Sequence, residues 1–464
     1  MTTTSTSFTP RVMGVSTTRD HAWKPISETA IGPRKGLPDV LVILDNPRQI
    51  IDGFGASFSE LGWLALARLS VESRENVMRE LFAPGVGANF TLCRMPIGAN
   101  DFSRGWYSYD EDEGDLELDH FSIANDLDTL VPFIREAQTH QPALRLWASP
   151  WSPPSWMKSN GHYAGSRRQG GIMCDNGLRP DQVRAEGTDT FIQDDRFLAA
   201  YAAYFGRFID EYRALGIPIE MVMPQNEFNS PQVFPSCTWT PEGLTRFVTH
   251  LGPQMRKRGV ELFVGTLERA DDHLLDNVLQ DPTSAPFVTG AGLQWAGKHA
   301  LGGLRSRFPQ LRVYQTEQEC GDGKNEWRFA RYTWTQIKHY LAGGASGYMY
   351  WNIALEAGGV SRWGWPQNSL VVVEPATGSF TFTPDYYVFR HLTRYVAPGA
   401  RLLQTVSLNG YENQLAFQNH DGTTVVVIHN DMPDEQTISF GVGRRTHAVT
   451  LAPDSINSLL FRRE

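Results

Sequence analysis

The stretch Met221-Val-Met-Pro-Gln-Asn-Glu-Phe-Asn229 decides the fold prediction. The apolar residues that lead into it, from Ile217 on, predict a buried parallel strand. That strand ends abruptly in Gln225, Asn226 and Glu227. An apolar strand that presents an amide and a carboxylate at its C-terminal end is typical of a barrel enzyme, because the chemistry of such enzymes lies at the strand tips.

A second run of the same kind ends in Glu317. The segment Leu311-Arg-Val-Tyr-Gln-Thr-Glu317 predicts another strand with a carboxylate at its tip. Glycoside hydrolysis needs a carboxyl pair, in which one group protonates the leaving oxygen and the other attacks the sugar or activates water. A single glutamate after a strand is more often a solvated loop residue or the partner of a helix N-terminus. Two of them, each after an apolar strand, favour Glu227 and Glu317 as catalytic residues.

The whole chain predicts an α/β fold, a (β/α)8 TIM barrel with an appended all-β side sandwich domain. Apolar runs alternate with segments of helical periodicity, which is the pattern of that barrel. The predicted barrel strands cover residues 51–58, 90–97, 144–149, 217–223, 262–266, 287–295, 311–317 and 347–352. The predicted helices cover residues 60–81, 127–137, 195–215, 241–259 and 327–341.

The pattern changes after about residue 395, where short alternating runs separated by turn residues predict a small β-sandwich. We therefore predict a catalytic barrel over residues 49–392 and a side sandwich over residues 393–464. The N-terminal segment, residues 1–48, is expected to contribute to the sandwich through a strand at Val40–Leu44. Residues 1–38 are rich in Thr, Ser and Pro, and we expect them to be weakly structured.

Composition argues against several classes of function. The formal net charge is −9 and Lys and Arg form no large cluster, so a nucleic-acid partner or an anionic membrane surface is not expected. The chain has no complete dinucleotide loop, no phosphate loop and no His-Glu-x-x-His motif, and its four cysteines fit no zinc pattern. We therefore expect no cofactor and no metal.

The sequence also bears on location. No apolar run is long enough for an integral membrane segment, and the N-terminus has neither the basic region nor the apolar region of a secretory signal. We therefore expect a cytoplasmic protein, or a secreted one if a signal has been removed.

Six motifs carry a family resemblance. They are Asp52-Gly-Phe-Gly-Ala-Ser-Phe-Ser59, Arg94-Met-Pro-Ile-Gly-Ala-Asn-Asp-Phe-Ser103, Ala148-Ser-Pro-Trp-Ser-Pro-Pro-Ser-Trp-Met-Lys-Ser-Asn-Gly161, Gln225-Asn-Glu227, Thr316-Glu317 and Tyr350-Trp-Asn352. Together they resemble glycoside hydrolase family 30, the group that includes the glucosylceramidases. The resemblance spans residues from about 40 to 464, and the motif at 148–161 is the most specific part of it.

The resemblance implies a retaining glycosidase and assigns roles to residues. It makes Glu227 the acid/base and Glu317 the nucleophile, and it matches Asn226 to the asparagine that holds the sugar's 2-hydroxyl. It also matches Asp101, Trp151 and Trp351 to positions that line the subsite of the cleaved sugar. We predict Gln294 and Trp295 at the wall of the same pocket, because they follow a predicted barrel strand and active sites lie on that face. Carboxyl groups as close as about 5–5.5 Å raise each other's cost of ionising, so Glu227 is expected to stay protonated while Glu317 is charged.

Three departures from the family pattern leave the sugar open. Phe228 follows the acid/base where many members have proline, and Gln294 stands where glucosylceramidases carry histidine. Glu319 lies two residues beyond Glu317 and is a rival nucleophile, because residues two apart in a strand face the same side. The Thr316-Glu317 match favours Glu317.

The functional hypothesis is therefore a retaining hydrolase of β-linked glycosides that acts on a carbohydrate substrate by a two-glutamate double displacement. We expect exo action of the β-glucosidase or glucosylceramidase kind, or on β-xylosides or β-fucosides. One alternative on the same fold is an endo-β-1,6-glycanase, either a glucanase or a galactanase. An alternative of another class is a non-catalytic carbohydrate-binding protein, which the presence of both carboxylates disfavours.

Overall fold

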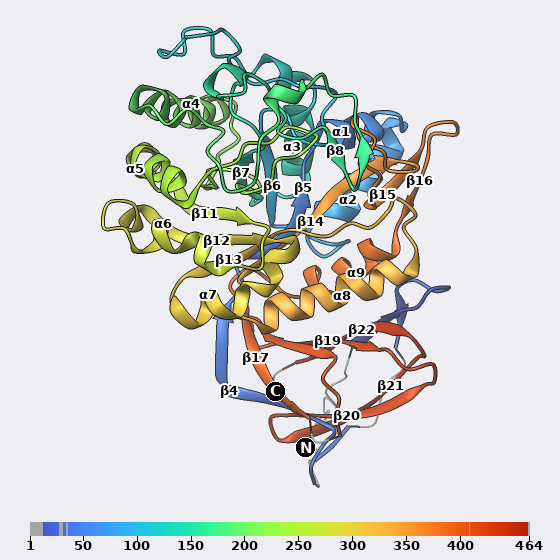
Figure 1. Cartoon of the computed structure of the whole chain (residues 1–464). Coiled ribbons are helices and arrows are strands. Elements are labelled where there is room, and N and C mark those ends of the chain that lie inside the picture. The colour runs from blue at the N-terminus through green and yellow to red at the C-terminus, as the bar shows by residue number, and fades with distance from the viewer. Residues whose placement is uncertain (1–12, 27–30, 34–35, 408, 463–464) are drawn as a thin grey trace.

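The middle of the chain forms a closed barrel of parallel strands (Figure 1). The computed structural model describes residues 13–26, 31–33, 36–407 and 409–462. The N-terminal residues on which the location was predicted therefore lie outside the described residues. The barrel strands among the described residues are β5 (Gly53–Ser57), β6 (Leu92–Ile97), β7 (Arg145–Pro150), β10 (Met221–Val222), β11 (Glu261–Leu267), β12 (Val288–Gln294), β13 (Arg312–Glu317) and β14 (Gly347–Glu356).

Parallel pairing closes these strands into a ring. Each strand pairs with the next one in chain order, and β14 pairs with β5 to complete the barrel. Two further strands, β15 (Ser369–Glu374) and β16 (Ser379–Phe382), extend the sheet outward from β14. The (β/α)8 fold predicted from the alternation of strands and helices is confirmed.

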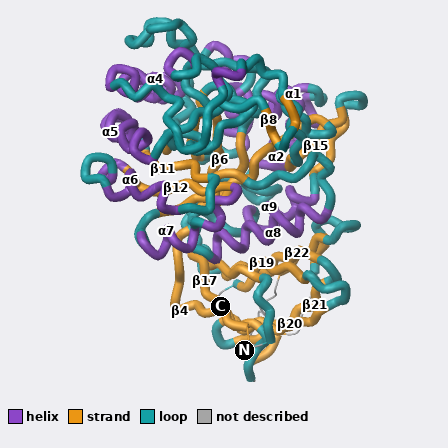
Figure 2. The backbone as a smooth tube through the Cα atoms, in the orientation of Figure 1, coloured by secondary structure: helices purple, strands orange, loops and turns teal. Residues whose placement is uncertain are grey.

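Helices surround the barrel on its outside (Figure 2). Those that the structure describes are α1 (Glu60–Ala67), α2 (Val71–Phe82), α3 (Leu130–His140), α4 (Asp195–Ala214), α5 (Pro241–Arg258), α6 (Asp276–Gln280), α7 (Leu301–Arg307), α8 (Trp327–Ala342) and α9 (Pro384–Thr393). None of the helices in the described ranges is both long enough and apolar enough to span a bilayer.

The prediction of one continuous helix over residues 60–81 is wrong. The chain forms α1 and α2 there, because Ser70 adopts an extended conformation and its side chain accepts a hydrogen bond from the backbone N–H of Ser73. A serine in this position caps a new helix, and the apolar spacing continues across the break without revealing it.

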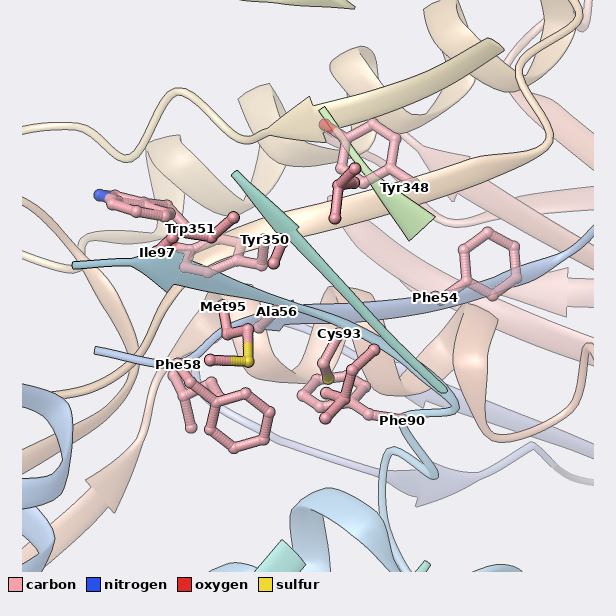
Figure 3. Close-up of a cluster of buried hydrophobic side chains, with 14 of the residues drawn as sticks. Phe54, Ala56, Phe58, Phe90, Cys93, Met95, Ile97, Tyr348, Tyr350 and Trp351 are labelled. Atoms are coloured by element: carbon pink, nitrogen blue, oxygen red, sulfur yellow. The ribbon is translucent and has the colours of Figure 1, made fainter. Parts of the chain in front are cut away.

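Apolar side chains plug the inside of the barrel and form the floor beneath the strand tips. The members of this plug are Leu92, Trp147, Met221, Met223, Phe263, Tyr314 and Met349. Successive inward-facing residues of a strand are two positions apart, so the next inward residue of β6 after Leu92 is Arg94. A larger apolar core packs the strands against the helices (Figure 3). Its members on β5 and β6 include Phe54, Ala56, Cys93 and Met95.

The side domain is a curled sheet built from both ends of the chain. Its N-terminal strands are β1 (Met13–Thr17), β2 (Lys24–Pro25), β3 (Ile31–Pro33) and β4 (Val40–Ile50). Its C-terminal strands are β17 (Arg401–Ser407), β18 (Gln414–Gln418), β19 (Thr424–Asn430), β20 (Gln436–Val442), β21 (Arg445–Leu451) and β22 (Ser455–Phe461). Strand β4 lies between β17 and β20, and β1 pairs with β22.

The expectation that residues 1–38 are weakly structured is wrong for Met13–Thr17. This short segment forms five antiparallel pairs with β22, from Met13 with Leu460 to Thr17 with Ile456. Its own sequence carries little strand pattern, and its partner lies more than four hundred residues away in the chain. The strand therefore forms because β22 offers it an edge.

A buried histidine joins the side domain to the barrel. His391 of α9 is fully buried, and its ring nitrogens lie 2.8 Å from the hydroxyls of Ser458 on β22 and Thr17 on β1. The Ser458 hydroxyl donates to the His391 carbonyl oxygen, so it accepts from the ring N–H at Nδ1. Nε2 then accepts from Thr17. Burial lowers the pKa of His391 to about 3, so this ring is neutral.

We expect His391→Ala to lower the free energy of unfolding by about 2–4 kcal/mol at pH 7, because it opens a cavity and removes the hydrogen-bond partners of two buried hydroxyls. The difference in the free energy of unfolding between the wild type and the variant should become smaller below pH 6.5. Below that pH the unfolded wild-type chain binds a proton at His391 and the folded chain does not. The free energy of unfolding of the wild type therefore falls by about 1.4 kcal/mol for each pH unit of acidification, and that of the variant does not. Urea unfolding between pH 7 and pH 5 measures both effects.

The control is His420→Ala, which removes an exposed histidine from the turn between β18 and β19. It should change the free energy of unfolding by less than about 0.5 kcal/mol. A His391→Ala loss that stayed constant from pH 7 to pH 5 would contradict the neutral, buried ring.

Candidate active site

A pocket of about 280 Å³ opens at the carboxyl ends of the barrel strands. The residues predicted for the site that line it are Asp101, Trp151, Asn226, Glu227, Trp295 and Glu317. The other two predicted residues lie directly behind this lining. Gln294 contacts both glutamates, and Trp351 stacks on Trp151 with ring centroids 5.3 Å apart. The structure thus brings all eight predicted residues together.

Backbone hydrogen bonds from neighbouring strands fix the segment that carries Glu227. The Asn226 N–H donates to the Pro150 carbonyl at the end of β7, and the Glu227 N–H donates to the Thr266 hydroxyl on β11. Glu227 itself has a φ of 47°, in the left-handed region that residues other than glycine rarely adopt. The backbone therefore turns sharply at Glu227, five residues after the end of β10.

Trp295 makes the same kind of turn on the opposite wall. Its φ is 49°, and it follows directly on the last residue of β12. This turn brings its indole nitrogen to 2.9 Å from Oε1 of Glu317, so that the indole N–H donates to the carboxylate. Residues with a left-handed backbone thus position both glutamates. Glu227 has this backbone itself, and Glu317 is held by the indole of Trp295, which has it too.

Glu317 faces the pocket and its rival Glu319 does not. Oε2 of Glu317 accepts a hydrogen bond from Arg94 at 2.8 Å, and its side chain is almost completely buried. Glu319 instead lies outside the pocket, where its carboxylate contacts the ammonium group of Lys298 at 2.5 Å and the hydroxyl of Tyr332 at 2.7 Å. The argument from strand alternation does not apply to Glu319, because β13 ends at Glu317.

One amide group joins the two glutamates. Nε2 of Gln294 lies 3.3 Å from Oε1 of Glu227 and 3.3 Å from Oε2 of Glu317. The two oxygens are therefore separated by no more than twice that distance. A shared hydrogen-bond donor of this kind is compatible with the short separation of about 5–5.5 Å between the carboxyl groups of retaining glycosidases.

Sequence reasoning quoted Arg94 within a motif but gave it no role, and the structure places it at the centre of the site. Its guanidinium is fully buried and donates to Glu317, to Oδ1 of Asn226 at 2.7 Å and to the hydroxyl of Ser149 at 2.9 Å. It lies 4.3 Å from the ring centroid of Trp151 and also contacts the rings of Trp147 and Trp351. A signal was present, because a lone charge inside the apolar run Leu92–Ile97 requires a buried partner.

The surroundings separate the pKa values of the two glutamates. Burial raises the pKa of Glu227 well above its usual range, and the negative charge of Glu317 raises it further. Burial also raises the pKa of Glu317, but the charge of Arg94 and the hydrogen bond from Trp295 oppose that rise. Glu317 therefore ionises first, and Glu227 keeps its proton to higher pH.

Three polar groups around the pocket are arranged to receive a ligand. All of the recorded hydrogen bonds of the Asn226 side chain use Oδ1, which leaves its NH₂ group for a ligand hydroxyl. Oδ1 of Asp101 and Nε1 of Trp351 are buried without a well-aligned hydrogen bond among the described residues, although the indole N–H of Trp351 lies close enough to Asp101 to oppose the rise in its pKa. Burial and the charge of Glu317 raise the pKa of Asp101 well above its usual range. A hydroxylated ligand would supply the missing partners.

A third pocket glutamate, Glu268, was missed by sequence reasoning. It follows β11 directly, is 2% exposed and lines the pocket. The rule that identified Glu227 and Glu317 would have found it, because it too stands at the tip of an apolar strand. Gln232 was also missed, and its side chain donates to Oε2 of Glu227 at 3.0 Å. It lies in a loop, where nothing in the sequence marks it.

No group of three or more His, Cys, Asp and Glu side chains among the described residues is arranged to hold a metal ion. The chemistry that these residues support is an acid next to an ionised carboxylate, in a pocket walled by tryptophan and amide groups.

Comparisons with known families match nearly the whole chain. The model of the glycosyl hydrolase family 30 TIM-barrel domain matches residues 51–396, and that of the glycosyl hydrolase family 30 beta sandwich domain matches residues 404–459. The two matches coincide with the barrel and with the C-terminal strands of the side domain.

Individual relatives agree with these matches. A putative glucosylceramidase of Caenorhabditis elegans is 28% identical and aligns with 82% of this chain and 74% of its own length. An endo-1,6-β-D-glucanase of Aspergillus fumigatus is 27% identical and aligns with 82% of this chain and 79% of its own. Among solved structures, SrfJ from Salmonella typhimurium has a TM-score of 0.84 at 24% identity and covers 98% of this chain and 100% of its own, which shows a shared fold.

We expect Arg94→Lys to lower kcat/KM by about 100-fold, because a lysine cannot donate to Glu317, Asn226 and Ser149 at once and the carboxyl pair loses its alignment. The acid limb of the pH profile should also move to higher pH. Lysine donates fewer hydrogen bonds than the guanidinium, so it stabilises the ionised form of Glu317 less and the pKa of Glu317 rises. The pH dependence of kcat/KM on an aryl β-glycoside measures both.

Arg312→Lys is the matched control, because Arg312 starts β13 at the opposite end of the barrel and pairs with Asp52 and Glu261. It should leave both the rate and the acid limb unchanged. An Arg94→Lys enzyme whose acid limb stayed in place would show that Arg94 does not set the ionisation of Glu317.

Proposed function

The chain belongs to glycosyl hydrolase family 30, and we propose that within this family it is an exo-acting retaining β-glucosidase with Glu227 as acid/base and Glu317 as nucleophile. The observation that carries the proposal is the amide of Gln294, which lies 3.3 Å from an oxygen of each glutamate. This spacing supports a direct attack by a carboxylate rather than attack by a water molecule held between the two groups.

In the first step, Oε2 or Oε1 of Glu317 attacks the anomeric carbon while Glu227 gives its proton to the leaving oxygen. Arg94, Trp295 and Gln294 hold the nucleophile ionised and oriented by their hydrogen bonds to its two oxygens. The raised pKa of Glu227 keeps its proton available for the transfer.

In the second step, Glu227 is ionised and acts as base. It removes a proton from water, and the water oxygen attacks the anomeric carbon and releases Glu317. Gln232 and Gln294 donate to the oxygens of Glu227 and stabilise the charge that it carries in this step. The NH₂ group of Asn226 is available to hold the 2-hydroxyl of the sugar throughout.

Two observations support exo action on a glucoside. The pocket volume of about 280 Å³ lies near the lower end of the range of ~300–1,000 Å³ for ligand pockets, which suits one sugar ring and part of its leaving group. The curated relatives in both functional groups, glucosylceramidases and endo-1,6-β-glucanases, carry names that refer to glucose.

The second candidate is an endo-β-1,6-glucanase. It is favoured by the Aspergillus relative, which matches as much of this chain as the nematode glucosylceramidase does. A non-catalytic carbohydrate-binding protein is disfavoured, since the acid, the nucleophile and the donors that orient both are present.

Aryl β-glycosides of glucose, xylose, fucose, galactose and glucuronate test the sugar, and we expect the highest kcat/KM on the glucoside. A soluble β-1,6-glucan tests the mode of action. An exo enzyme should release only glucose while the chain length falls slowly, as followed by size-exclusion chromatography. A rapid fall in chain length with oligosaccharide products would establish the endo alternative.

The two carboxylates can be told apart by azide rescue. Glu227→Ala should hydrolyse a dinitrophenyl glycoside far better than an alkyl glycoside, because an activated leaving group departs without a proton. Azide should restore its turnover and yield the β-glycosyl azide. Glu317→Ala should lose activity on every substrate, and rescue there should yield the α-glycosyl azide. NMR of the azide products determines their configuration.

Glu319→Ala is the control, because Glu319 is paired with Lys298 outside the pocket. It should keep most of the activity. If Glu319→Ala were inactive while Glu317→Ala kept its activity, the nucleophile would be Glu319 and not Glu317.

A further inference from the structure

Glu268 presents an unsatisfied carboxylate oxygen at the wall of the pocket. Its Oε1 accepts a hydrogen bond from the hydroxyl of Ser230 at 2.8 Å, whereas its Oε2 is buried and has no hydrogen-bond partner among the described residues. A buried acceptor of this kind is costly unless something donates to it. Burial is the main cause of the raised pKa of Glu227 and the charge of Glu268 adds to it, but no step of the catalytic cycle described above uses the free oxygen of Glu268.

A rigid donor stands beside this acceptor. The guanidinium of Arg269 lines the same pocket and lies 3.4 Å from Oε1 of Glu268. Glu186 holds that guanidinium from the outside, with hydrogen bonds of 2.8 Å to Nε and 3.1 Å to Nη2. Glu268 and Arg269 thus offer one acceptor and one fixed donor side by side, which matches the hydroxyl groups on adjacent carbons of a sugar.

The connections of Glu268 place it on the leaving-group side of the bond that is cleaved. Its partner Ser230 belongs to the loop that follows the acid/base, and the Ser230 N–H donates to the Glu227 carbonyl. The same loop supplies Gln232, which donates to the carboxyl group of Glu227. The acid/base must face the leaving oxygen, whereas the nucleophile faces the ring that stays bound. Side chains grouped around Glu227 therefore border the leaving group.

Aromatic rings also line the pocket. Phe234, from the same loop, and Trp365 both line it. Sugar rings present apolar C–H faces that pack on aromatic rings, while their hydroxyls need partners at the edge. Burial raises the pKa of Glu268 to about 7, so near neutral pH the carboxyl group is present both as an acceptor and as a hydroxyl donor, and each form can bind a hydroxyl.

We propose that Glu268 and Arg269 form a leaving-group subsite whose ligand is a second sugar rather than an apolar chain. This inference rests on the proposed glycosidase function and specifies the leaving group for it. The hydroxyls of the departing sugar bind Oε2 of Glu268 and the guanidinium of Arg269, and its ring packs on Phe234. A sugar acceptor occupies the same subsite when it attacks the glycosyl-enzyme in place of water.

Glu268→Gln is the decisive variant, because glutamine keeps the volume and the hydrogen bond from Ser230 has an acceptor in its amide oxygen. The donor is the aryl β-glycoside that the wild type hydrolyses fastest, so the test does not depend on which sugar that is. With this donor, products are measured in the presence of glucose or of methanol as acceptor. We expect the ratio of transfer to glucose over transfer to methanol to fall at least tenfold, because both transfers use the same glycosyl-enzyme and the same acid/base and only glucose needs the subsite.

Arg269→Lys should shift the same ratio in the same direction with a smaller effect, and Glu319→Gln should leave it unchanged. A melting temperature for each variant separates local effects from loss of folding. An unchanged ratio of sugar transfer to methanol transfer in folded Glu268→Gln would overturn the subsite. Equal losses for both acceptors would do the same, since they would mean that Glu268 acts only on the acid/base. Failure to hydrolyse any aryl glycoside would instead refute the glycosidase function itself.

Discussion

The buried guanidinium of Arg94 is the interaction on which the site depends. A charge in the middle of a barrel is expensive to desolvate, and here that cost is offset by hydrogen bonds to a carboxylate, an amide oxygen and a hydroxyl, and by the faces of three tryptophans. The apolar plug beneath it excludes water from the floor. Because one rigid group contacts both Glu317 and Asn226, the proposed nucleophile and the amide proposed to hold the sugar are positioned together.

The electrostatics of the pocket extend this arrangement. Four carboxyl groups among the described residues line it, from Asp101, Glu227, Glu268 and Glu317. Three of them, Glu317, Asp101 and Glu227, lie close enough to the guanidinium of Arg94 to stabilise its positive charge. Mutual repulsion and burial raise the pKa values of the group, so protons are retained where the mechanism needs an acid. The positive charge that develops on a sugar ring during glycoside cleavage is stabilised by such surroundings, because the carboxylates are fixed before the reaction begins.

The sequence predicted the features that arise from local pattern, and it missed those that depend on distant partners. Apolar strands ending in polar residues revealed the barrel and Glu227 and Glu317. The strand at Met13–Thr17 could not be read, because β22 alone makes it a strand. The charge of Arg94 inside an apolar strand indicated a buried partner, but its partners Glu317, Asn226 and Ser149 come from distant parts of the chain and only the structure identifies them. Glu268 is a different case, because it also follows an apolar strand directly and the pattern that predicted Glu227 and Glu317 applies to it as well.

The left-handed backbone at Glu227 and Trp295 has a consequence for how this sequence can change. Positive φ costs on the order of 1 kcal/mol or more at residues other than glycine, and glycine would relieve it at either place. Selection for thermal stability alone would therefore favour glycine at the two turns that aim the acid/base and the indole donor. The chain keeps a less stable backbone there because only a side chain can carry out the reaction. Directed evolution or computational redesign that selects for stability must keep these two residues unchanged. Otherwise it will produce a more stable protein that no longer cleaves its substrate.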